Sequence, residues 1–344
     1  MNVPRGPALR ARANPRLLDV LRERYGIGIA SQPDVKDLGG SSNLNLLVTV
    51  AAERYVVRVY RPWVTTARLA DIQRARETLD EGGVSSPRPI RTLGGMSWTS
   101  VDGRLVEIER YVEHDATMDS WERLALGLPL LGRVHSLLRP LRSSADGKRA
   151  PAANTIAAPA ALAWTLAGTR RIRDWGPSPT ESRLAAAAED LARLVDAAER
   201  HVGSLPRQLV HGDFWDNNVF FRAGQPVLVT DLDFMGERPR IDDLALTLYY
   251  TNSTFTDDQV SDERVHRLRG LVDAYDSGLD EGLTAVERRA LPLALARAPL
   301  CFIGMVAATD TEAKGRRLAA EMAEDVSWAL DIARAPRRWH DAFA

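Results

Sequence analysis

The chain has 344 residues, enough for two domains or for two lobes around a cleft. Hydrophobic residues make up 45% and charged residues 26%, and the formal net charge is −1, so no charge excess points to nucleic acid or an anionic membrane as a partner. The single cysteine, Cys301, excludes an internal disulfide and a cysteine-based zinc site, which fits the reducing cytoplasm. We expect no signal peptide, because residues 1–15 lack an apolar run.

The first hundred residues or so have the composition of strands. Residues 44–50 and 54–60 are rich in β-branched and aromatic residues and flank a short turn, which predicts a hairpin. The stretch 66–81 has helical character and ends at two glycines. A further strand is predicted over 104–112.

From about residue 119 the pattern becomes helical, with apolar residues at steps of three and four. His135 lies on the apolar face of that helix, and we expect it to be packed rather than a ligand. A small-residue linker is predicted over 143–161, followed by a helical insert at about 160–202. The sequence therefore predicts an α+β fold with a small β-rich N-terminal lobe and a larger, mainly helical C-terminal lobe.

The end of the chain is also predicted to be helical, over about 250–344. Its longest apolar stretch begins at Leu291 and contains Arg297 and two prolines. These residues make a membrane span improbable, and we expect a buried helix pair instead.

A polar cluster interrupts apolar residues at 209–221, with the sequence LVHGDFWDNNVFF. The segments NVFF and VLVT that follow are predicted to form a hairpin that turns near Gly224. Asn218 and Asp231 flank this hairpin, so they meet at its open end, close to Asp213. Converging hard oxygen ligands suit Mg²⁺, and a carboxylate nearby that does not bind the metal is able to accept a proton from a hydroxyl.

The order His211-Gly-Asp213, Asn218 and Asp231 resembles the catalytic core of the aminoglycoside phosphotransferase and choline kinase superfamily, whose fold is related to that of protein kinases. The resemblance covers roughly residues 35–250. It implies a catalytic Asp213, with Asn218 and Asp231 as metal ligands. The supporting residues that it implies are His211, which positions the loop, Asp243, which is structural, and Asp233, at an often acidic position.

The resemblance also implies that residues 1–109 form a nucleotide-binding lobe, residues 110–113 a hinge, and residues 114–344 the catalytic and acceptor-binding lobe. A Gly/Ser turn before the strand at 44–50 is expected to lie over the phosphates, although a plain hairpin turn is an equally good interpretation of the turn alone. The predicted nucleotide-binding residues are Gly39, Gly40, Ser41, Ser42, Asn43, Arg58, Arg110, Tyr111 and Val112.

Arg58 stands where the family usually has a lysine that contacts phosphate. A guanidinium is able to hold phosphate oxygens in a bidentate manner, but an arginine on an edge strand in water is the alternative. The following helix offers Asp71 or Glu77 as an acidic partner for Arg58, and Asp71 is preferred. At 110–113, backbone atoms are expected to bind the adenine, while a plain strand end is equally consistent.

The resemblance implies a cytoplasmic enzyme that depends on ATP and Mg²⁺ and phosphorylates a hydroxyl of a small molecule. We expect an antibiotic or amino-sugar-like acceptor, with homoserine, choline or methylthioribose as alternatives. Acidic residues at 255–263 and 273–282 either meet a cationic acceptor or are solvated helix ends. A pseudokinase is disfavoured because all three core polar residues are present, and a protein kinase because no Ala-Pro-Glu segment follows. An aromatic wall for the acceptor is predicted from Trp164, Trp175, Trp215, Tyr249 and Tyr250.

Overall fold

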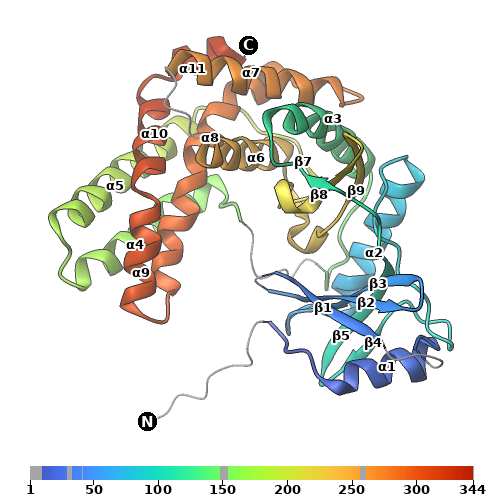
Figure 1. Ribbon diagram of the computed structural model, residues 1–344. Helices are drawn as coiled ribbons and strands as arrows, with labels where there is room; N and C mark the ends of the chain where they lie inside the picture. The colour runs from blue at the N-terminus through green and yellow to red at the C-terminus, as the bar shows by residue number, and fades with distance from the viewer. Residues whose placement is uncertain (1–9, 29–32, 41, 148–153, 256–260, 344) are drawn as a thin grey trace. The chain divides into compact units, whose positions relative to one another are not determined.

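The computed structural model describes residues 10–28, 33–40, 42–147, 154–255 and 261–343 (Figure 1). The chain divides into two compact units. The N-terminal unit comprises residues 1–117, 143–151 and 220–230, and the C-terminal unit comprises residues 118–142, 152–219 and 231–344.

The N-terminal unit is built on a five-stranded antiparallel sheet with the strand order β1-β2-β3-β5-β4. Its strands are β1 (Asp34–Gly39), β2 (Leu44–Val50), β3 (Glu53–Val59), β4 (Thr99–Val101) and β5 (Arg104–Arg110), and its helices are α1 (Pro15–Tyr25) and α2 (Thr66–Glu81). The predicted strands at 44–50 and 54–60 and the predicted helix at 66–81 are confirmed, with shifts of one residue at most.

The two faces of this sheet have different compositions because side chains alternate along a strand. Leu44, Leu46, Val57 and Ile108 point to one face, where they form a core cluster with the buried residues of α1. Arg58 and its cross-strand partner Glu107 point to the other face, together with charged side chains from α2. Figure 1 shows α1 and α2 on opposite sides of the sheet.

A second, three-stranded sheet in the N-terminal unit contains the predicted hairpin. Its strand order is β6-β8-β9, with β6 (Ala116–Thr117), β8 (Val219–Arg222) and β9 (Gln225–Val229). Gly224 lies between β8 and β9 with φ of 74°, which favours glycine, so the turn is where the sequence predicted it.

The C-terminal unit is mainly helical and holds one two-stranded sheet, β7 (Arg207–Val210) with β10 (Gly236–Pro239). Its helices are α3 (Trp121–Leu138), α4 (Ala158–Asp174), α5 (Pro179–Glu199), α6 (Arg240–Thr254), α7 (Ser261–Ser277), α8 (Ala285–Met305), α9 (Glu312–Glu321), α10 (Ala323–Arg334) and α11 (Pro336–Phe343). The α+β prediction of a small β-rich lobe and a larger helical lobe is confirmed. The exact lobe boundaries and the hinge at 110–113 stay predictions.

The apolar stretch from Leu291 was predicted to be a helix pair, and this prediction is wrong. It belongs to the single helix α8, which contains both Pro292 and Pro299. Packing against α4, α6 and α10 stabilises the helix despite the hydrogen bonds that the prolines remove, and Figure 1 shows α8 among these helices. Within the described residues, 285–308 is the one helical stretch long and apolar enough to cross a membrane, and 83% of its most apolar window is buried in the protein.

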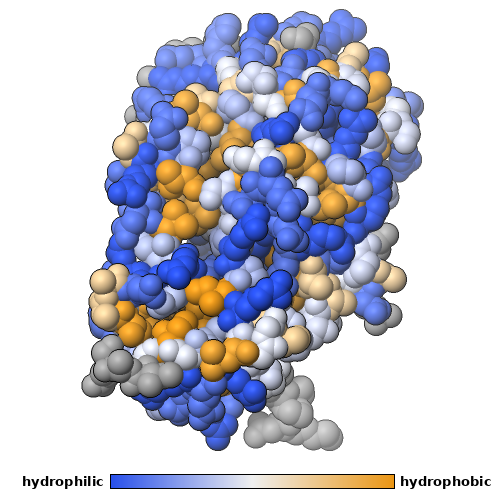
Figure 2. Space-filling model, turned by 90° about the vertical axis from the view of Figure 1, so that its right-hand side faces the viewer, coloured by the Kyte–Doolittle hydropathy of each residue, from blue (hydrophilic) through white to orange (hydrophobic). Residues whose placement is uncertain are grey.

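The surface mixes polar and apolar side chains. On the face shown in Figure 2, hydrophobic residues occur in several groups that hydrophilic residues separate. The large exposed hydrophobic side chains include Leu93, Met96 and Met305. Scattered exposed apolar residues are normal for a globular protein, so the surface alone indicates no partner.

Candidate active site

The candidate site is built on the loop that follows β7 in the C-terminal unit. His211 is fully buried, and Gly212 has φ of 84°. A Cβ atom on Gly212 would lie 2.2 Å from the Phe234 carbonyl oxygen, so this position requires glycine for both its backbone conformation and its close approach. The chain thus turns sharply here and presents Asp213 at the end of a buried strand.

Asp243, in the first turn of helix α6, holds this loop through hydrogen bonds. Both carboxylate oxygens of Asp243 lie 3.1 Å from the Gly212 nitrogen, and Oδ2 lies 3.0 Å from Nε2 of His135. Burial acts to raise the pKa of Asp243, but the hydrogen bond and charge of His135, the charge of His211 and the Gly212 N–H outweigh it and lower the pKa. Asp243 is therefore an ionised anchor for the loop.

His135 completes this anchor from α3. Because a carboxylate only accepts hydrogen bonds, Nε2 of His135 donates to Asp243, and Nδ1 forms a hydrogen bond of 2.8 Å with the Tyr275 hydroxyl. His135 is fully buried, as expected for a packed side chain. One turn along α6, Thr247 donates to the Phe214 carbonyl at 2.7 Å and fixes the loop at a second point.

The Asp213 carboxylate is held by two side-chain amides. Asn154 Nδ2 donates to Oδ1 at 2.7 Å, and Asn218 Nδ2 donates to Oδ2 at 3.2 Å and to the Asp213 carbonyl at 2.8 Å. Burial and the negative charges of Asp231 and Asp243 raise the pKa of Asp213 to about 7, against the lowering effect of the two amides. A carboxylate whose pKa lies near neutrality is suited to accept a proton at physiological pH.

Asp231 approaches Asp213 from the segment after β9. Its backbone has φ of 62° and ψ of 58°, a left-handed conformation that is uncommon for a residue other than glycine. Such outliers cluster at functional sites, where the surroundings hold the strain. The next residues form the short helix η2 (Leu232–Phe234), which buries Asp233.

These residues fit a magnesium ion. The amide nitrogen of Asn218 is used by Asp213, which leaves the amide oxygen of this buried residue for a cation. Asp231 supplies a carboxylate whose charge already perturbs Asp213. No group of three or more His, Cys, Asp or Glu side chains poised for a metal ion occurs among the described residues. Mg²⁺ instead needs only one or two protein carboxylates, with water and phosphate as its other ligands.

Aromatic rings lie close to the Asp213 carboxylate. The Trp215 and Tyr250 ring centroids are 5.4 Å apart, and Tyr250 also contacts Phe302 at 6.3 Å. Burial raises the pKa of the Tyr250 hydroxyl, and the charge of Asp213 raises it further. Of the aromatic wall predicted from the sequence, the structure groups Trp215, Tyr249 and Tyr250, to which it adds Phe302.

The other two aromatic residues of the predicted wall have different neighbours. Trp164 donates through Nε1 to the Cys301 carbonyl at 2.8 Å. Trp175 lies under the guanidinium of Arg316, 5.1 Å from the ring centroid. Both contacts tie helices together, so these two rings have structural partners within the helical unit.

In the N-terminal unit, the predicted Gly/Ser turn follows β1. Gly39 and Gly40 have φ of 85° and 106°, and no atom of the described residues lies within 4 Å of a Cβ placed on Gly39. Ser41 lies outside the described residues, and Ser42 is half-buried. Asn43 is buried and accepts from the Arg61 N–H at 3.1 Å, so its side chain serves the turn itself. The Gly39 N–H already donates to Oδ1 of Asp37 at 2.8 Å, so a phosphate would have to use other backbone groups of the turn.

Arg58 is buried on β3, which rules out the alternative of an edge arginine in water. It donates to the Thr230 hydroxyl at 3.3 Å. The predicted partner Asp71 has other contacts, because its carboxylate accepts from Arg74 and from the backbone and hydroxyl of Ser144. The expected pairing of Asp71 with Arg58 is thus not among the described contacts.

The acidic group opposite Arg58 comes from a strand instead of the helix. Glu107 on β5 is the cross-strand partner of Arg58. Arg76 of α2, whose side chain is 1% exposed, donates to Glu107 at 3.2 Å and to Glu109 at 2.8 Å. The helix therefore contributes the cation Arg76, and the sheet contributes the carboxylates. The sequence had instead predicted an acidic partner on the helix, either Asp71 or Glu77. A buried arginine is hard to detect from sequence, because its spacing resembles that of surface arginines.

The predicted adenine-binding backbone at Arg110, Tyr111 and Val112 is partly used by the protein. The Tyr111 N–H donates to the Arg54 carbonyl at 3.0 Å, and the Val112 carbonyl contacts Nδ1 of His114 at 2.9 Å. The Arg110 side chain is exposed and pairs with Glu53. A nucleotide would have to use the remaining backbone groups of this segment.

Comparison with known proteins finds a matching family and several relatives. The family model of the Phosphotransferase enzyme family (APH) matches residues 35–281. Homoserine kinases of Gluconacetobacter diazotrophicus and Phenylobacterium zucineum are 26% and 25% identical to this chain, over 77% and 76% of both sequences.

Solved structures are similar in fold across most of the chain. An amicoumacin kinase in complex with AMP-PNP, Ca²⁺ and its ligand has a TM-score of 0.67 at 14% identity and covers 92% of this chain and 93% of its own. A microcompartment-associated aminopropanol kinase has a TM-score of 0.67 at 16% identity, with 94% and 97% covered. A spectinomycin phosphotransferase in complex with ADP and spectinomycin has a TM-score of 0.63 at 12% identity, with 94% and 98% covered.

Proposed function

Because this chain belongs to the Phosphotransferase enzyme family and is a small-molecule kinase, we propose that it transfers the γ-phosphoryl group of ATP to a small-molecule hydroxyl with Asp213 as general base. The observation that carries this proposal is the Asp213 carboxylate itself. It lies at the end of a buried strand, is oriented by two amides, and has a pKa of about 7.

In this mechanism Asp213 accepts the hydrogen bond of the acceptor hydroxyl and takes its proton as the new O–P bond forms, while the bond from the γ-phosphorus to the β,γ-bridging oxygen breaks and ADP leaves. Asn218 and Asp231 would hold Mg²⁺, which when bound neutralises charge on the phosphate oxygens. His211 and Asp243 keep the loop in place, so that the base is fixed before the acceptor binds. Arg58 and the Gly39–Gly40 turn would bind phosphates, and the backbone near Tyr111 would bind the adenine.

The charges of the C-terminal unit support an acceptor with little net charge. Acidic residues at 273–282 were one candidate for binding a polycation, yet several are neutralised by arginine, since Asp276 pairs with Arg288 and Asp280 with Arg133. The other acidic candidates lie at 255–263. Two of them, Asp257 and Asp258, fall in the range 256–260, which lies outside the described residues. A polycation needs several carboxylates without competing cations, because like charges oppose binding. These ion pairs favour the interpretation of solvated helix ends.

We therefore propose a compact amino alcohol as the acceptor, with homoserine as the first compound to test. Two observations support this choice: the ion-paired acidic residues, and the similarity to homoserine kinases over three quarters of the chain. The aromatic group of Trp215, Tyr250 and Phe302 would form one wall of the acceptor site. The acceptors expected from the sequence, an antibiotic or an amino sugar, are tested in the same experiment.

The test is ADP release from ATP and Mg²⁺ with separate acceptors: homoserine, choline, aminopropanol, glucosamine, methylthioribose, kanamycin and spectinomycin. We expect homoserine or another small amino alcohol to give the highest kcat/KM. Turnover confined to kanamycin or spectinomycin would overturn the acceptor proposal and leave the kinase assignment intact. Nucleotide binding without turnover of any compound would support the pseudokinase alternative.

A further inference from the structure

The segment before α4 contacts the proposed general base. Asn154 lies in a stretch without regular secondary structure, four residues before α4 begins at Ala158. Its amide nitrogen is 2.7 Å from Oδ1 of Asp213, the shorter of the two amide hydrogen bonds to this carboxylate. A hydrogen bond to an ionised acceptor is among the stronger ones in proteins, so this contact fixes the carboxylate as well as the segment.

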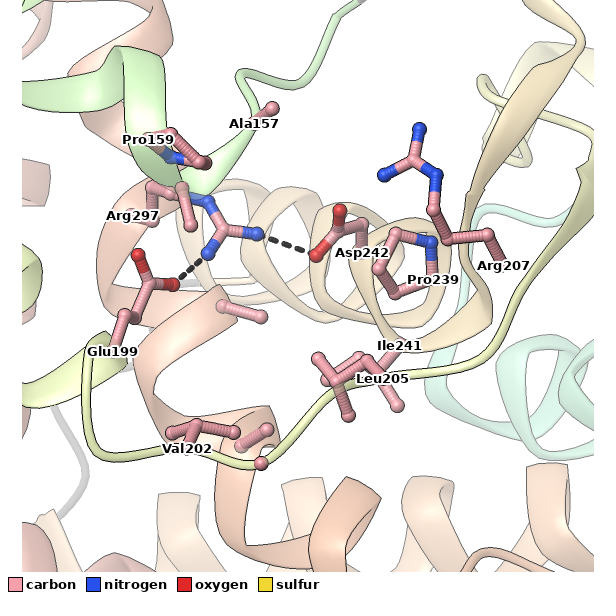
Figure 3. Close-up of a pocket in the computed structure, with 14 residues that line it drawn as sticks. Ala157, Pro159, Glu199, Val202, Leu205, Arg207, Pro239, Ile241, Asp242 and Arg297 are labelled. Carbon is pink, nitrogen blue, oxygen red and sulfur yellow. Dashed lines mark hydrogen bonds and ion pairs between the residues drawn. The ribbon is translucent and has the colours of Figure 1, made fainter.

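The same segment is anchored two residues later by Arg297 of α8. Nε of Arg297 donates to the Ile156 carbonyl at 2.9 Å. Its other nitrogens donate to Glu199 and Asp242, and Figure 3 shows the guanidinium between these two carboxylates beside a cavity of about 220 Å³. Ala157 and Pro159 line the same cavity. Arg297 is 6% exposed, so its three partners leave the guanidinium little freedom to move.

We propose that Asn154 is a positioning residue for phosphoryl transfer, and that the buried Arg297 holds the segment that presents it to Asp213. This inference rests on the proposed function of Asp213 as general base. It assigns a role in the reaction to a part of the predicted linker, just before α4, that the catalytic motif does not include.

The physical reason lies in the rotation of a carboxylate. The χ2 torsion of aspartate is broad, so the plane of its oxygens is set by hydrogen bonds rather than by a steep rotamer well. With both amides in place, Asn154 fixes Oδ1 and Asn218 fixes Oδ2. Each oxygen keeps a lone pair for an acceptor hydroxyl. Without Asn154 the carboxylate is held at one oxygen only and samples orientations that do not point at the acceptor.

The first experiment compares Asn154→Ala, Asn154→Asp and Asn154→Gln with the full-length wild type. ADP release is measured with ATP, Mg²⁺ and the best acceptor of the panel, or with water as acceptor if none is turned over. Loss of a hydrogen bond to a charged group predicts a fall in kcat of roughly tenfold to a hundredfold for Asn154→Ala, with the KM for ATP unchanged. Asn154→Gln keeps an amide donor and should retain part of the activity.

Asn154→Asp separates a positioning role from a packing role. Aspartate has nearly the same shape as asparagine, so a packing role predicts a mild effect. A positioning role predicts a lower kcat than Asn154→Ala, because the substitution removes the donor and places a second acceptor against Asp213. The expected order of kcat is therefore wild type, Gln, Ala and then Asp.

The second experiment tests the anchor. Arg297→Lys keeps the positive charge between Glu199 and Asp242 but lacks the forked geometry that reaches the Ile156 carbonyl. We expect Arg297→Lys to lower kcat, as Asn154→Ala does. The double variant should be no worse than Asn154→Ala alone, because both changes release one segment.

The matched control is Arg316→Lys. Arg316 likewise combines a carboxylate partner, Glu181, with a backbone carbonyl, that of Trp175 at 2.9 Å, at the C-terminal end of α4. None of its described contacts involves the segment at Asn154, so its kcat should match that of the wild type.

Two results would overturn the inference: Asn154→Ala and Asn154→Asp both within twofold of wild-type kcat, or Asn154→Asp more active than Asn154→Ala. Failure of the general-base proposal looks different, since Asp213→Asn would then retain near wild-type turnover. If Asp213→Asn is inactive while the Asn154 variants are normal, only the present inference fails.

Discussion

The anchor residue Asp243 provides a quantitative test of how the catalytic loop is held. In Asp243→Asn the side chain keeps its size but loses its charge and replaces one acceptor oxygen with a donor nitrogen. Two donors now face it, the Gly212 N–H at 3.1 Å and His135 Nε2 at 3.0 Å. The amide oxygen is able to serve only one of them well, so one buried donor loses its partner.

A hydrogen bond to a charged group contributes about 1.5–3 kcal/mol, and an unsatisfied buried donor costs a further amount of about 1–3 kcal/mol. We therefore expect Asp243→Asn to lower the free energy of unfolding by about 2.5–6 kcal/mol. The assay is urea unfolding of the full chain, where the midpoint should fall while the slope stays constant. Activity at low urea should fall as well, because Gly212 directly precedes Asp213.

The matched control is Asp331→Asn on α10, an exposed carboxylate on the same unit. Surface substitutions of this kind change stability by no more than about 0.5 kcal/mol. Unfolding midpoints of Asp243→Asn and Asp331→Asn that coincide with the wild type would refute the account of Asp243 as an ionised anchor.

Three further predictions concern Asp231, Arg58 and Glu189. Asp231→Ala should abolish Mg²⁺-dependent nucleotide binding without unfolding the chain, and superimposable Mg²⁺ titrations of variant and wild type would contradict its role as a ligand. Arg58→Ala should raise the KM for ATP and Arg58→Lys should keep part of the function, because charge survives without the bidentate fork; unchanged ATP kinetics in the alanine variant would contradict this. The hydrogen bond from Arg173 lowers the pKa of Glu189 to about 2, so the stability that this carboxylate contributes is present above the ordinary pKa of 4.5 and is lost as the pH falls toward 2. Glu189→Gln should therefore lose less stability than the wild type on acidification from pH 5 to 2, and parallel stability curves would show that Glu189 contributes nothing.

The sequence predicted local structure best where composition alone favours one conformation. The strand β3 is rich in β-branched and aromatic residues, and the hairpin at Gly224 has a residue that tolerates positive φ, so both were located correctly. The loop from His211 to Asn218 was also identified, because so many polar residues within an apolar frame require partners.

The sequence did not predict contacts between residues that lie far apart along the chain. Asn154 meets Asp213 across 59 residues of sequence, and Arg297 reaches the Ile156 carbonyl across 141. Neither residue lies in a distinctive pattern, since Asn154 lies within the small-residue linker and Arg297 lies within an apolar helix. Thr247 offered a weak signal, because it is one helical turn from Asp243 and therefore on the same face of α6.

The most direct test of the proposed function is the turnover of Asp213→Asn with ATP, Mg²⁺ and the best acceptor of the panel, measured together with ATP binding. Loss of the general base predicts a fall in kcat of at least about a hundredfold, while ATP still binds with an affinity close to that of the wild type. Near wild-type turnover in Asp213→Asn would contradict the assignment of Asp213 as the base.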